Sequence, residues 1–366
     1  MKAMQVITLQ LVLFVFCGLN LPAQNSEARN INLDIENFND TYRGSGGIRV
    51  GFYNVENLFD VYDDSLKRDD SFTPGGDNHW TSYKYREKLS KLSRVITALG
   101  GWEPIEVLGL CEVENRRVLI DLIHETALDE TNYQIIHHES PDNRGIDVAL
   151  IYNADKIIVL NHRAVEVDFL ESDSRPTRDI LHVEARFKKY DIHFFVNHWP
   201  SRYGGHLATI PKRNRAADIL RTEVEKIYKE SPDANIVIMG DFNDYPNDES
   251  ILKHLYARPD TAGMSDTSLF NLMYSKMDSE GTHKYQGKWG ILDQFVVNGT
   301  LLRGKNGLQT EPANALIFKA DFLLTEDATH VGKKLFRTFT GFKYSGGYSD
   351  HLPIILDLQT LQRSTK

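Results

Sequence analysis

Cysteine is nearly absent from this chain of 366 residues, which contains only Cys17 and Cys111. Cys17 lies in an apolar N-terminal segment that we expect to be removed, which would leave Cys111 as the only thiol. A single thiol excludes an internal disulfide, so stability must come from the hydrophobic core. Cys111 directly follows the apolar run 107–110, and we interpret it as a buried structural residue rather than a nucleophile.

An excess of positive charge is also absent, because 42 basic residues stand against 51 acidic ones and the formal net charge is -9. This balance argues against a broad basic surface that grips polyanions, but it leaves room for a local basic groove. The acidity is compatible with a nuclease and with a phosphatase for small substrates, and it leans slightly toward the phosphatase.

Long apolar runs are missing after the N-terminus. Lys2 precedes the apolar run 6–19, and Pro22 and Ala23 follow it. This order is typical of a secretory signal peptide, here over residues 1–23. The run is shorter than the about 20 residues that a transmembrane helix needs, although a retained membrane anchor is an alternative. We therefore expect a secreted or periplasmic protein with no membrane span after signal removal.

Residues 24–47 are predicted to form a flexible leader, because they are rich in Asn, Asp and Gly and have little apolar periodicity. Residues 48–360 contain no internal repeat, low-complexity tract or interior linker, and short apolar strands alternate with helices, which favours one α/β domain. A helix is predicted over residues 85–99, closed by Gly100 and Gly101, and another from Pro211 to about residue 228. Strands are predicted at residues 48–53, 107–110, 148–152, 182–187, 192–196, 236–239, 293–297 and 352–358.

Polar side chains gather where the predicted strands begin or end. Strands hold residues rigidly at the rim of a sheet, so such a gathering is where an active site is usually built. Carboxylates and amides are hard oxygen ligands, which suit Mg²⁺ or Ca²⁺ rather than Zn²⁺. A metal beside imidazoles fits hydrolysis of a phosphate ester, in which the metal neutralises charge and a base activates water. The clusters are Asn54 with Glu56 and Asn57; Glu112 with Glu114 and Asn115; Asn197 with His198; Asp241 with Asn243 and Asp244; Asp293; and Asp350 with His351.

Five short motifs at these positions follow one another in an order that resembles the endonuclease/exonuclease/phosphatase superfamily. Each motif alone is weak, whereas five in order over residues 48–358 are a strong signal. The resemblance implies an α/β fold of two packed β-sheets flanked by helices, a four-layer sandwich, and metal-dependent hydrolysis of phosphate esters. The motifs are Phe-Tyr-Asn-Val-Glu-Asn (52–57), Leu-Cys-Glu-Val (110–113), Asn-His-Trp-Pro (197–200), Gly-Asp-Phe-Asn-Asp (240–244) and Ser-Asp-His-Leu-Pro (349–353).

The resemblance also implies a metal site. Glu112 corresponds to the principal metal-binding glutamate of the superfamily, with Asn54 close to the metal and to a phosphate oxygen, and Asp350 beside the metal. Mg²⁺ is the expected ion, with Mn²⁺ and Ca²⁺ as alternatives. Taken alone, Asn54 would be interpreted as a cap for the turn after its strand.

Five further positions match catalytic residues of the superfamily. Asp241 matches the aspartate that orients or deprotonates the attacking water, and Asn243 helps to hold the phosphate. His198 matches the imidazole that binds a non-bridging oxygen, and His351 matches the second imidazole, which Asp293 is expected to orient. Without the other motifs, segment 241–244 would be interpreted as a plain Asx-turn and both histidines as structural.

Four more residues are predicted to contact substrate or to position a histidine, on weaker grounds. We expect Arg144 to touch phosphate and Asp147 to orient the first catalytic histidine, although a loop salt bridge between Arg144 and Asp142 is an equal alternative. Arg175 and Arg202 are further candidates, because the planar guanidinium group suits a phosphate.

A nuclease is the favoured function within this class. The asparagine-rich first motif and residues 197–202 resemble the secreted bacterial nuclease branch, so we expect an extracytoplasmic, monomeric endonuclease that acts on DNA or RNA. A phosphatase or phosphodiesterase for small-molecule or lipid phosphate esters is the alternative, since fold does not fix substrate. An inactive relative that only binds a partner is a second alternative. It is disfavoured because each principal site position holds a residue that is competent for catalysis.

Overall fold

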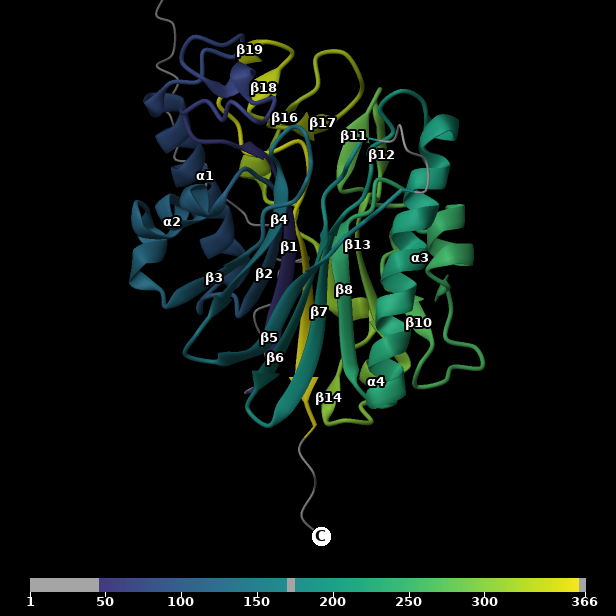
Figure 1. Cartoon of the computed structure of the whole chain (residues 1–366). Helices are drawn as coiled ribbons and strands as arrows, with labels where there is room; N and C mark the ends of the chain where they lie inside the picture. The colour runs from purple at the N-terminus through teal and green to yellow at the C-terminus, as the bar shows by residue number, and fades with distance from the viewer. Residues whose placement is uncertain (1–45, 170–174, 362–366) are drawn as a thin grey trace, which may run out of the picture.

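The computed structural model describes residues 46–169 and 175–361 of the chain, and two β-sheets pack face to face within it (Figure 1). The predicted signal peptide lies outside the described residues, as does the predicted leader except for Gly46 and Gly47. Within the described ranges, no helix combines the length and the apolar character needed to cross a bilayer.

The first sheet has β1 near its centre, parallel to β2 and antiparallel to β20. Almost every side chain of β1 and β2 is buried, because helices cover one face of this sheet and the second sheet covers the other. In order across the sheet, the strands are β14 (Leu308–Gln309), β20 (Ile354–Thr360), β1 (Ile48–Leu58), β2 (Val107–Val113), β4 (Asp147–Asn153) and β3 (Tyr133–His137), with β15 (Ala315–Ile317) also paired to β20.

The second sheet is built around β7 and β8, which are parallel neighbours. The predicted pairing of strands 182–187 and 192–196 is confirmed, because β6 and β7 form an antiparallel hairpin. In order across the sheet, the strands are β5 (Ile157–Val165), β6 (Ile180–Phe187), β7 (Tyr190–His198), β8 (Asn235–Asp241), β13 (Asp293–Asn298), β10 (Leu269–Asn271) and β9 (Ala257–Arg258).

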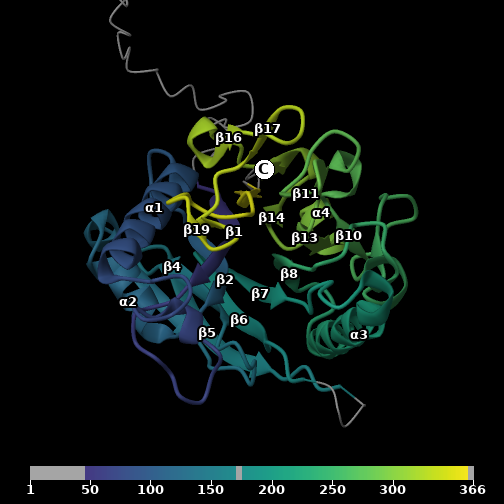
Figure 2. The same ribbon diagram turned by 90° about the horizontal axis from the view of Figure 1, so that it is seen from above.

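Helices form the two outer layers, as the view from above shows (Figure 2). Helices α1 (Ser82–Gly100) and α2 (Arg116–His124) cover the first sheet, and α3 (His206–Glu230) and α4 (Gly299–Arg303) lie on the side of the second. The predicted end of the first helix is confirmed: Gly101 follows with a φ of 73° and donates its N–H to the carbonyl of Thr97.

The predicted start of the long helix is wrong, because α3 begins five residues before Pro211. The Thr209 hydroxyl lies 3.0 Å from the carbonyl oxygens of both Gly205 and His206, and it shares its one proton between these acceptors in the first turn of the helix. Proline has a helical φ, so Pro211 costs this helix one backbone hydrogen bond without ending it.

Short elements complete the chain, and three hairpins stand at the upper edge in Figure 1. The hairpins are β11 (His283–Tyr285) with β12 (Lys288–Gly290), β16 (Leu324–Glu326) with β17 (Lys333–Leu335), and β18 (Phe339–Thr340) with β19 (Lys343–Tyr344). The single-turn helices are Asp70–Phe72, Ala127–Glu130, Ser250–His254, Tyr274–Lys276, Pro312–Asn314 and Asp321–Leu323.

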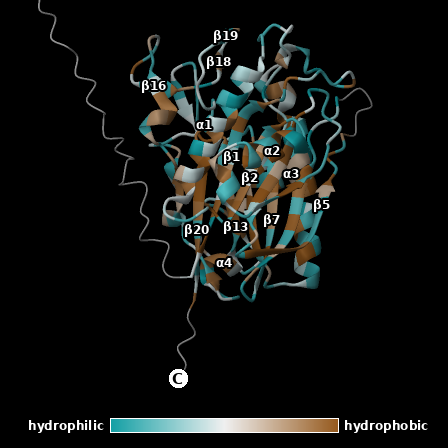
Figure 3. Cartoon of the chain, turned by 90° about the vertical axis from the view of Figure 1, so that its left-hand side faces the viewer, coloured by the Kyte–Doolittle hydropathy of each residue, from teal (hydrophilic) through white to brown (hydrophobic). Residues whose placement is uncertain are grey.

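The hydrophobic core has two parts. The larger part lies between the sheets and under α1 and α2, and the smaller part lies between the second sheet and α3. In Figure 3 the apolar colour concentrates on the strands and the polar colour on the loops at the sheet edges. The predicted four-layer α/β sandwich is confirmed.

Candidate active site

Strand ends from both sheets meet at one edge of the sandwich, the upper edge in Figure 1. Strands β1 and β2 end there, as do β7 and β8, and β13 begins there opposite the end of β8. A hydrogen bond crosses between the sheets at this edge, because Asn54 Nδ2 donates to Asp241 Oδ2 at 3.1 Å. The topology therefore brings together the first and fourth motifs, which are 187 residues apart.

Glu112 is aimed at this edge by a β-bulge. The pairing of β2 with β4 shifts register between Cys111 and Val113, and Glu112 takes a φ of 61°, which is costly for a residue with a Cβ. Its Oε2 accepts the N–H of Asn57 at 3.0 Å. Its Oε1 lies 3.9 Å from His198 Nε2, farther than a direct hydrogen bond, so this oxygen faces the site.

Asp241 lies between the two predicted imidazoles. Its Oδ2 is 3.7 Å from His198 Nε2 and 3.8 Å from His351 Nε2, and its Oδ1 accepts the N–H of Asn243 at 2.9 Å. Burial raises the pKa of Asp241 to about 6, with His351 opposing that shift and Asp293 adding to it. A carboxylate held in this way can accept a proton near neutral pH.

The two imidazoles carry different charges. His351 Nδ1 lies 2.7 Å from Asp293 Oδ2, so the predicted contact is present. Burial opposes protonation of His351, but Asp293 and Asp241 together raise its pKa well above the ordinary value. Burial lowers the pKa of His198 well below the ordinary value, and the cationic Arg178 lowers it further. One imidazole is thus cationic and the other neutral.

Asn243 and Asp350 are at the site but have protein partners. Asn243 Nδ2 donates to the carbonyl of Trp199 at 3.0 Å. Asp350 Oδ2 accepts from Arg337 Nη2 at 2.8 Å, and the same guanidinium binds Glu56. Burial acts to raise the pKa of Asp350, but Arg337 and then His351 bring it below the ordinary value. Asp350 is therefore an anion with one oxygen already engaged.

The prediction that Asp147 orients His198 is wrong. Asp147 is buried, and its carboxylate accepts from His137 Nε2 at 3.0 Å and from the N–H of Ser140 at 2.9 Å. Asp147 instead ties together the two ends of the loop between β3 and β4. Its partners lie at the end of β3 and just after it, and Asp147 begins β4.

The three predicted phosphate-binding arginines have different surroundings. Arg202 donates to the carbonyl of Asn243 at 2.8 Å and to Asp248 at 2.7 Å, so it fastens the loop after β8 and is not free to bind phosphate. Arg175 is exposed and forms no hydrogen bond or ion pair with another described residue. Arg144 is half exposed and lies 3.9 Å from Glu112 Oε1 and 4.0 Å from Asp142 Oδ1. Both interpretations of Arg144, as a phosphate contact and as the partner of Asp142 in a loop salt bridge, are compatible with this position.

Two buried cations near the site were missed from the sequence. Arg178 donates to Asp142 Oδ2 at 3.1 Å and to the carbonyl of Trp199 at 2.7 Å. Lys88 donates to Thr338 Oγ1 at 2.7 Å. Thr338 directly follows Arg337, whose guanidinium binds Asp350 and Glu56. A signal for Lys88 existed, because it falls on the apolar face of the predicted first helix.

His283 also lies beside the pair formed by His351 and Asp293, since its ring centroid is 4.8 Å from that of His351. His283, Asp350 and His351 form one group whose ligand atoms are close enough to hold an ion, and Asp241, Asp293 and His351 form another. Together they supply three carboxylates, from Asp241, Asp293 and Asp350, and carboxylate oxygens suit a hard divalent cation.

Comparison with known proteins finds one family model, described as the endonuclease/exonuclease/phosphatase family, which matches residues 49–360. No curated protein sequence matches the chain.

Several solved structures have the same fold. An endonuclease/exonuclease/phosphatase family protein from Bacteroides thetaiotaomicron is similar with a TM-score of 0.55 at 15% identity, covering 85% of this chain and 97% of that one. A mannosyl-6-phosphatase from the same organism has a TM-score of 0.52 at 14% identity, covering 86% and 100%. TDP2 from D. rerio, complexed with a single-strand DNA product, has a TM-score of 0.51 at 13% identity, covering 86% and 99%.

Proposed function

Because the chain belongs to the endonuclease/exonuclease/phosphatase family, whose members are phosphoesterases, we propose that it is a Mg²⁺-dependent nuclease that acts outside the cytoplasm. The observation that carries the hydrolytic part is the position of Asp241 between two imidazoles of unlike charge, beside the open oxygen of Glu112. This set contains an anion for a metal, a carboxylate for a water molecule and two groups for phosphate oxygens.

The metal would be held by Glu112, with Asn54 and Asp350 as neighbours. Bound there, it would neutralise the charge that develops on the phosphate. The fit rests on Glu112 Oε1, which lies too far from Arg144 and His198 for a direct hydrogen bond although both are near it. Mg²⁺ prefers such carboxylate and amide oxygens, and Mn²⁺ and Ca²⁺ bind the same donors.

The protein's own groups divide the remaining work. Asp241 is fixed by Asn54 and by the backbone of Asn243, so it can orient an attacking water and accept its proton. His351 is a cation held by Asp293 and can stabilise charge that grows in the transition state. The neutral His198 can donate one hydrogen bond to a non-bridging oxygen.

Exposed aromatic side chains around the site support a nucleic-acid substrate. Tyr203, in the loop after β7, is 89% exposed, and Tyr285 and Phe342, at the tips of two hairpins, are 67% and 76% exposed. These loops leave the catalytic edge in Figure 1. Bases of a single strand stack on such rings, and TDP2 from D. rerio holds a single-strand DNA product in the same fold.

The test offers the purified protein single-stranded DNA, RNA, bis-p-nitrophenyl phosphate and mannose 6-phosphate in parallel, with Mg²⁺. We expect cleavage of a nucleic acid. Tyr203→Ala should raise KM for the nucleic acid by about 5- to 150-fold, the range for one lost base stack, without changing hydrolysis of the dye ester. Tyr256→Ala is the matched control, since Tyr256 is 61% exposed but precedes β9, which lies toward the opposite edge.

The alternative is a phosphatase for small phosphate esters. The net charge of -9 favours it, and a mannosyl-6-phosphatase shares the fold. Turnover of mannose 6-phosphate with no cleavage of DNA or RNA would decide for this alternative.

A further inference from the structure

Arg337 links two carboxylates at the catalytic edge. It lies in the chain between the hairpins β16–β17 and β18–β19, and its Nε donates to Glu56 Oε1 at 2.8 Å. Its Nη2 donates to Asp350 Oδ2 at 2.8 Å. The side chain of Arg337 is 45% exposed, whereas those of Glu56 and Asp350 are 4% and 22% exposed. One half-exposed cation therefore holds two carboxylates, of which Asp350 is the predicted neighbour of the metal.

Glu56 fixes the guanidinium in this position. Its second oxygen, Oε2, accepts the N–H of Thr338 at 2.7 Å, so the two oxygens of Glu56 bind consecutive residues. Glu56 has a φ of 51°, which is costly for a residue with a Cβ, and the pairing of β1 with β2 is irregular at this point. The next residue, Asn57, donates its N–H to Glu112. This irregular segment of β1 thus serves both Arg337 and the predicted metal ligand.

The backbone around Asp350 is held by groups other than Arg337. Ser349 Oγ donates to the carbonyl of Asn54 at 2.6 Å and accepts the N–H of His351 at 3.1 Å. Among the described residues, Arg337 is the one that forms a hydrogen bond with the Asp350 carboxylate. Arg337 is therefore not needed to place the backbone of Asp350, and what it fixes is the side chain.

The guanidinium and a metal ion would compete for this carboxylate. Arg337 already neutralises Asp350 across one oxygen, and a divalent cation beside Asp350 would be repelled by the guanidinium, since like charges a few ångströms apart interact strongly in a partly buried site. The freedom that Asp350 would gain without Arg337 is the smaller effect, because its side chain has only two torsions to restrain. Loss of the cation should therefore favour the metal.

We propose that Arg337 is a positioning residue that competes with the catalytic metal for Asp350 and thereby lowers the metal affinity of the catalytic edge. This inference rests on the proposed metal site at Glu112, Asn54 and Asp350. Without a metal, Arg337 limits the repulsion between the carboxylates of Glu56 and Asp350, because it binds both.

The experiment measures Mn²⁺ binding to the chelator-treated full chain by calorimetry, since Mn²⁺ binds the carboxylate donors that suit Mg²⁺. We expect Arg337→Gln to tighten binding by about tenfold or more, the factor that a hydrogen bond to a charged group typically contributes. A purely structural role would weaken binding or leave it unchanged, so the direction separates the two. Arg337→Lys keeps the charge but loses the planar fork of donors, and it should tighten binding less.

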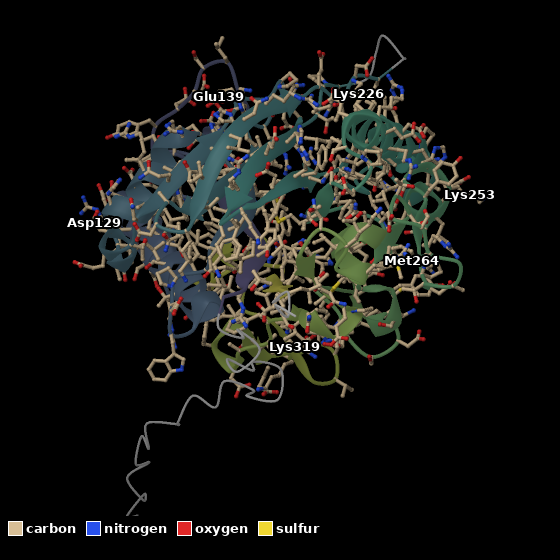
Figure 4. All side chains as sticks on the ribbon, turned by 90° about the horizontal axis from the view of Figure 1, so that it is seen from below. Asp129, Glu139, Lys226, Lys253, Met264 and Lys319 are labelled. Atoms are coloured by element: carbon tan, nitrogen blue, oxygen red, sulfur yellow. The ribbon has the colours of Figure 1, made fainter. Side chains whose placement is uncertain are left out.

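A cycle of variants shows whether the effect acts through Asp350. In the Asp350→Asn background, Arg337→Gln should lose most of its effect, because the carboxylate for which the two cations compete is gone. Arg303→Gln is the matched control, since its side chain is 49% exposed and binds Asp266 at 3.0 Å. Arg303 ends α4, which lies at the lower edge in Figure 1, the edge that faces the viewer in Figure 4. This control should bind Mn²⁺ as the unaltered chain does.

An affinity that Arg337→Gln weakens or leaves unchanged would overturn the proposal, as would an equal increase in the Asp350→Asn background. Either result still requires that Mn²⁺ binds, so it would leave the proposed metal site standing. A chain that binds no Mn²⁺ would refute that metal site and this proposal with it. Circular dichroism checks folding, and if Arg337→Gln fails to fold, Arg337→Lys decides the matter in the same two backgrounds.

Discussion

At the scale of single residues, the charge of His351 depends on one neighbour. Asp293 lies 2.7 Å from its Nδ1 and is buried, so Asp293→Asn keeps the shape but removes the charge that holds the imidazolium. We expect His351→Ala to lower kcat and kcat/KM together by about 10²–10⁴-fold, and Asp293→Asn to cause part of that loss. The double variant should lose clearly less than the sum of the two losses in free energy.

Steady-state kinetics of the two single variants and the double variant check this. Circular dichroism at matched temperature shows whether each variant is folded. Additive losses would show that the two residues act separately, and the arrangement inferred here would then be wrong.

Glu112 is the residue on which the metal hypothesis depends. Glu112→Gln keeps an oxygen for the N–H of Asn57 but removes the negative charge, so the chain should stay folded and lose metal-dependent activity by at least about 10²-fold. In the unaltered chain, EDTA should abolish turnover and Mg²⁺ or Mn²⁺ should restore it. Glu249→Gln, at an exposed glutamate, serves as the control. Full activity in excess chelator would refute the metal requirement.

At the scale of elements, the β6–β7 hairpin contains two histidines in contact. His182 Nε2 lies 3.1 Å from His193 Nδ1, and the His182 ring stacks on Phe195 with centroids 4.4 Å apart. Burial and, to a lesser extent, the neighbouring His193 lower the pKa of His182 to about 3. Both side chains are partly buried on strands that the fold holds rigid, so neither can turn away from the other.

The hairpin should therefore make stability depend on pH. The pKa of His182 is lower in the folded chain than in the unfolded chain, where it is near 6.5, so the unfolded chain binds the extra proton. The contribution is complete above about pH 6.5 and is lost as the pH falls toward 3, by at most about 1.4 kcal/mol per pH unit. Urea unfolding at pH 7.5 and pH 5 should show a smaller difference in His182→Gln than in the unaltered chain. His124→Gln, at an exposed histidine, should keep the full difference.

At the scale of the whole molecule, secretion is a proposal that rests on the N-terminal sequence. Lys2, the apolar run 6–19 and Ala23 predict removal of the segment and export of the remainder. Expression of the full sequence in a bacterial host should give a mature chain that begins shortly after Ala23 and is recovered outside the cytoplasm. N-terminal sequencing of the soluble fractions measures this, and an intact Met1 on cytoplasmic protein would contradict it.

The sequence by itself determined the elements and the kinds of residue at the site. Apolar runs ending in polar residues predicted the strands of β1, β2, β7 and β8, because alternation and burial leave a local pattern in the chain. The five motifs predicted the sandwich and pointed to residues such as Glu112 and Asp241 as members of one site. Local patterns also misled, since Pro211 is inside α3 rather than at its start.

Only the tertiary structure decided which side chains meet. The sequence predicted that Asp147 orients His198 and that Arg202 binds phosphate. In the structure Asp147 binds His137, and Arg202 binds Asp248 in the loop after β8. Arg178 and Lys88 were not predicted as site residues, yet the fold buries both beside the site. The reason is physical: hydrogen-bond partners and burial depend on residues far away in the chain, which local periodicity does not encode. The opposite pKa shifts of His198 and His351 have the same origin, because each pKa is set by neighbours that the two sheets bring together.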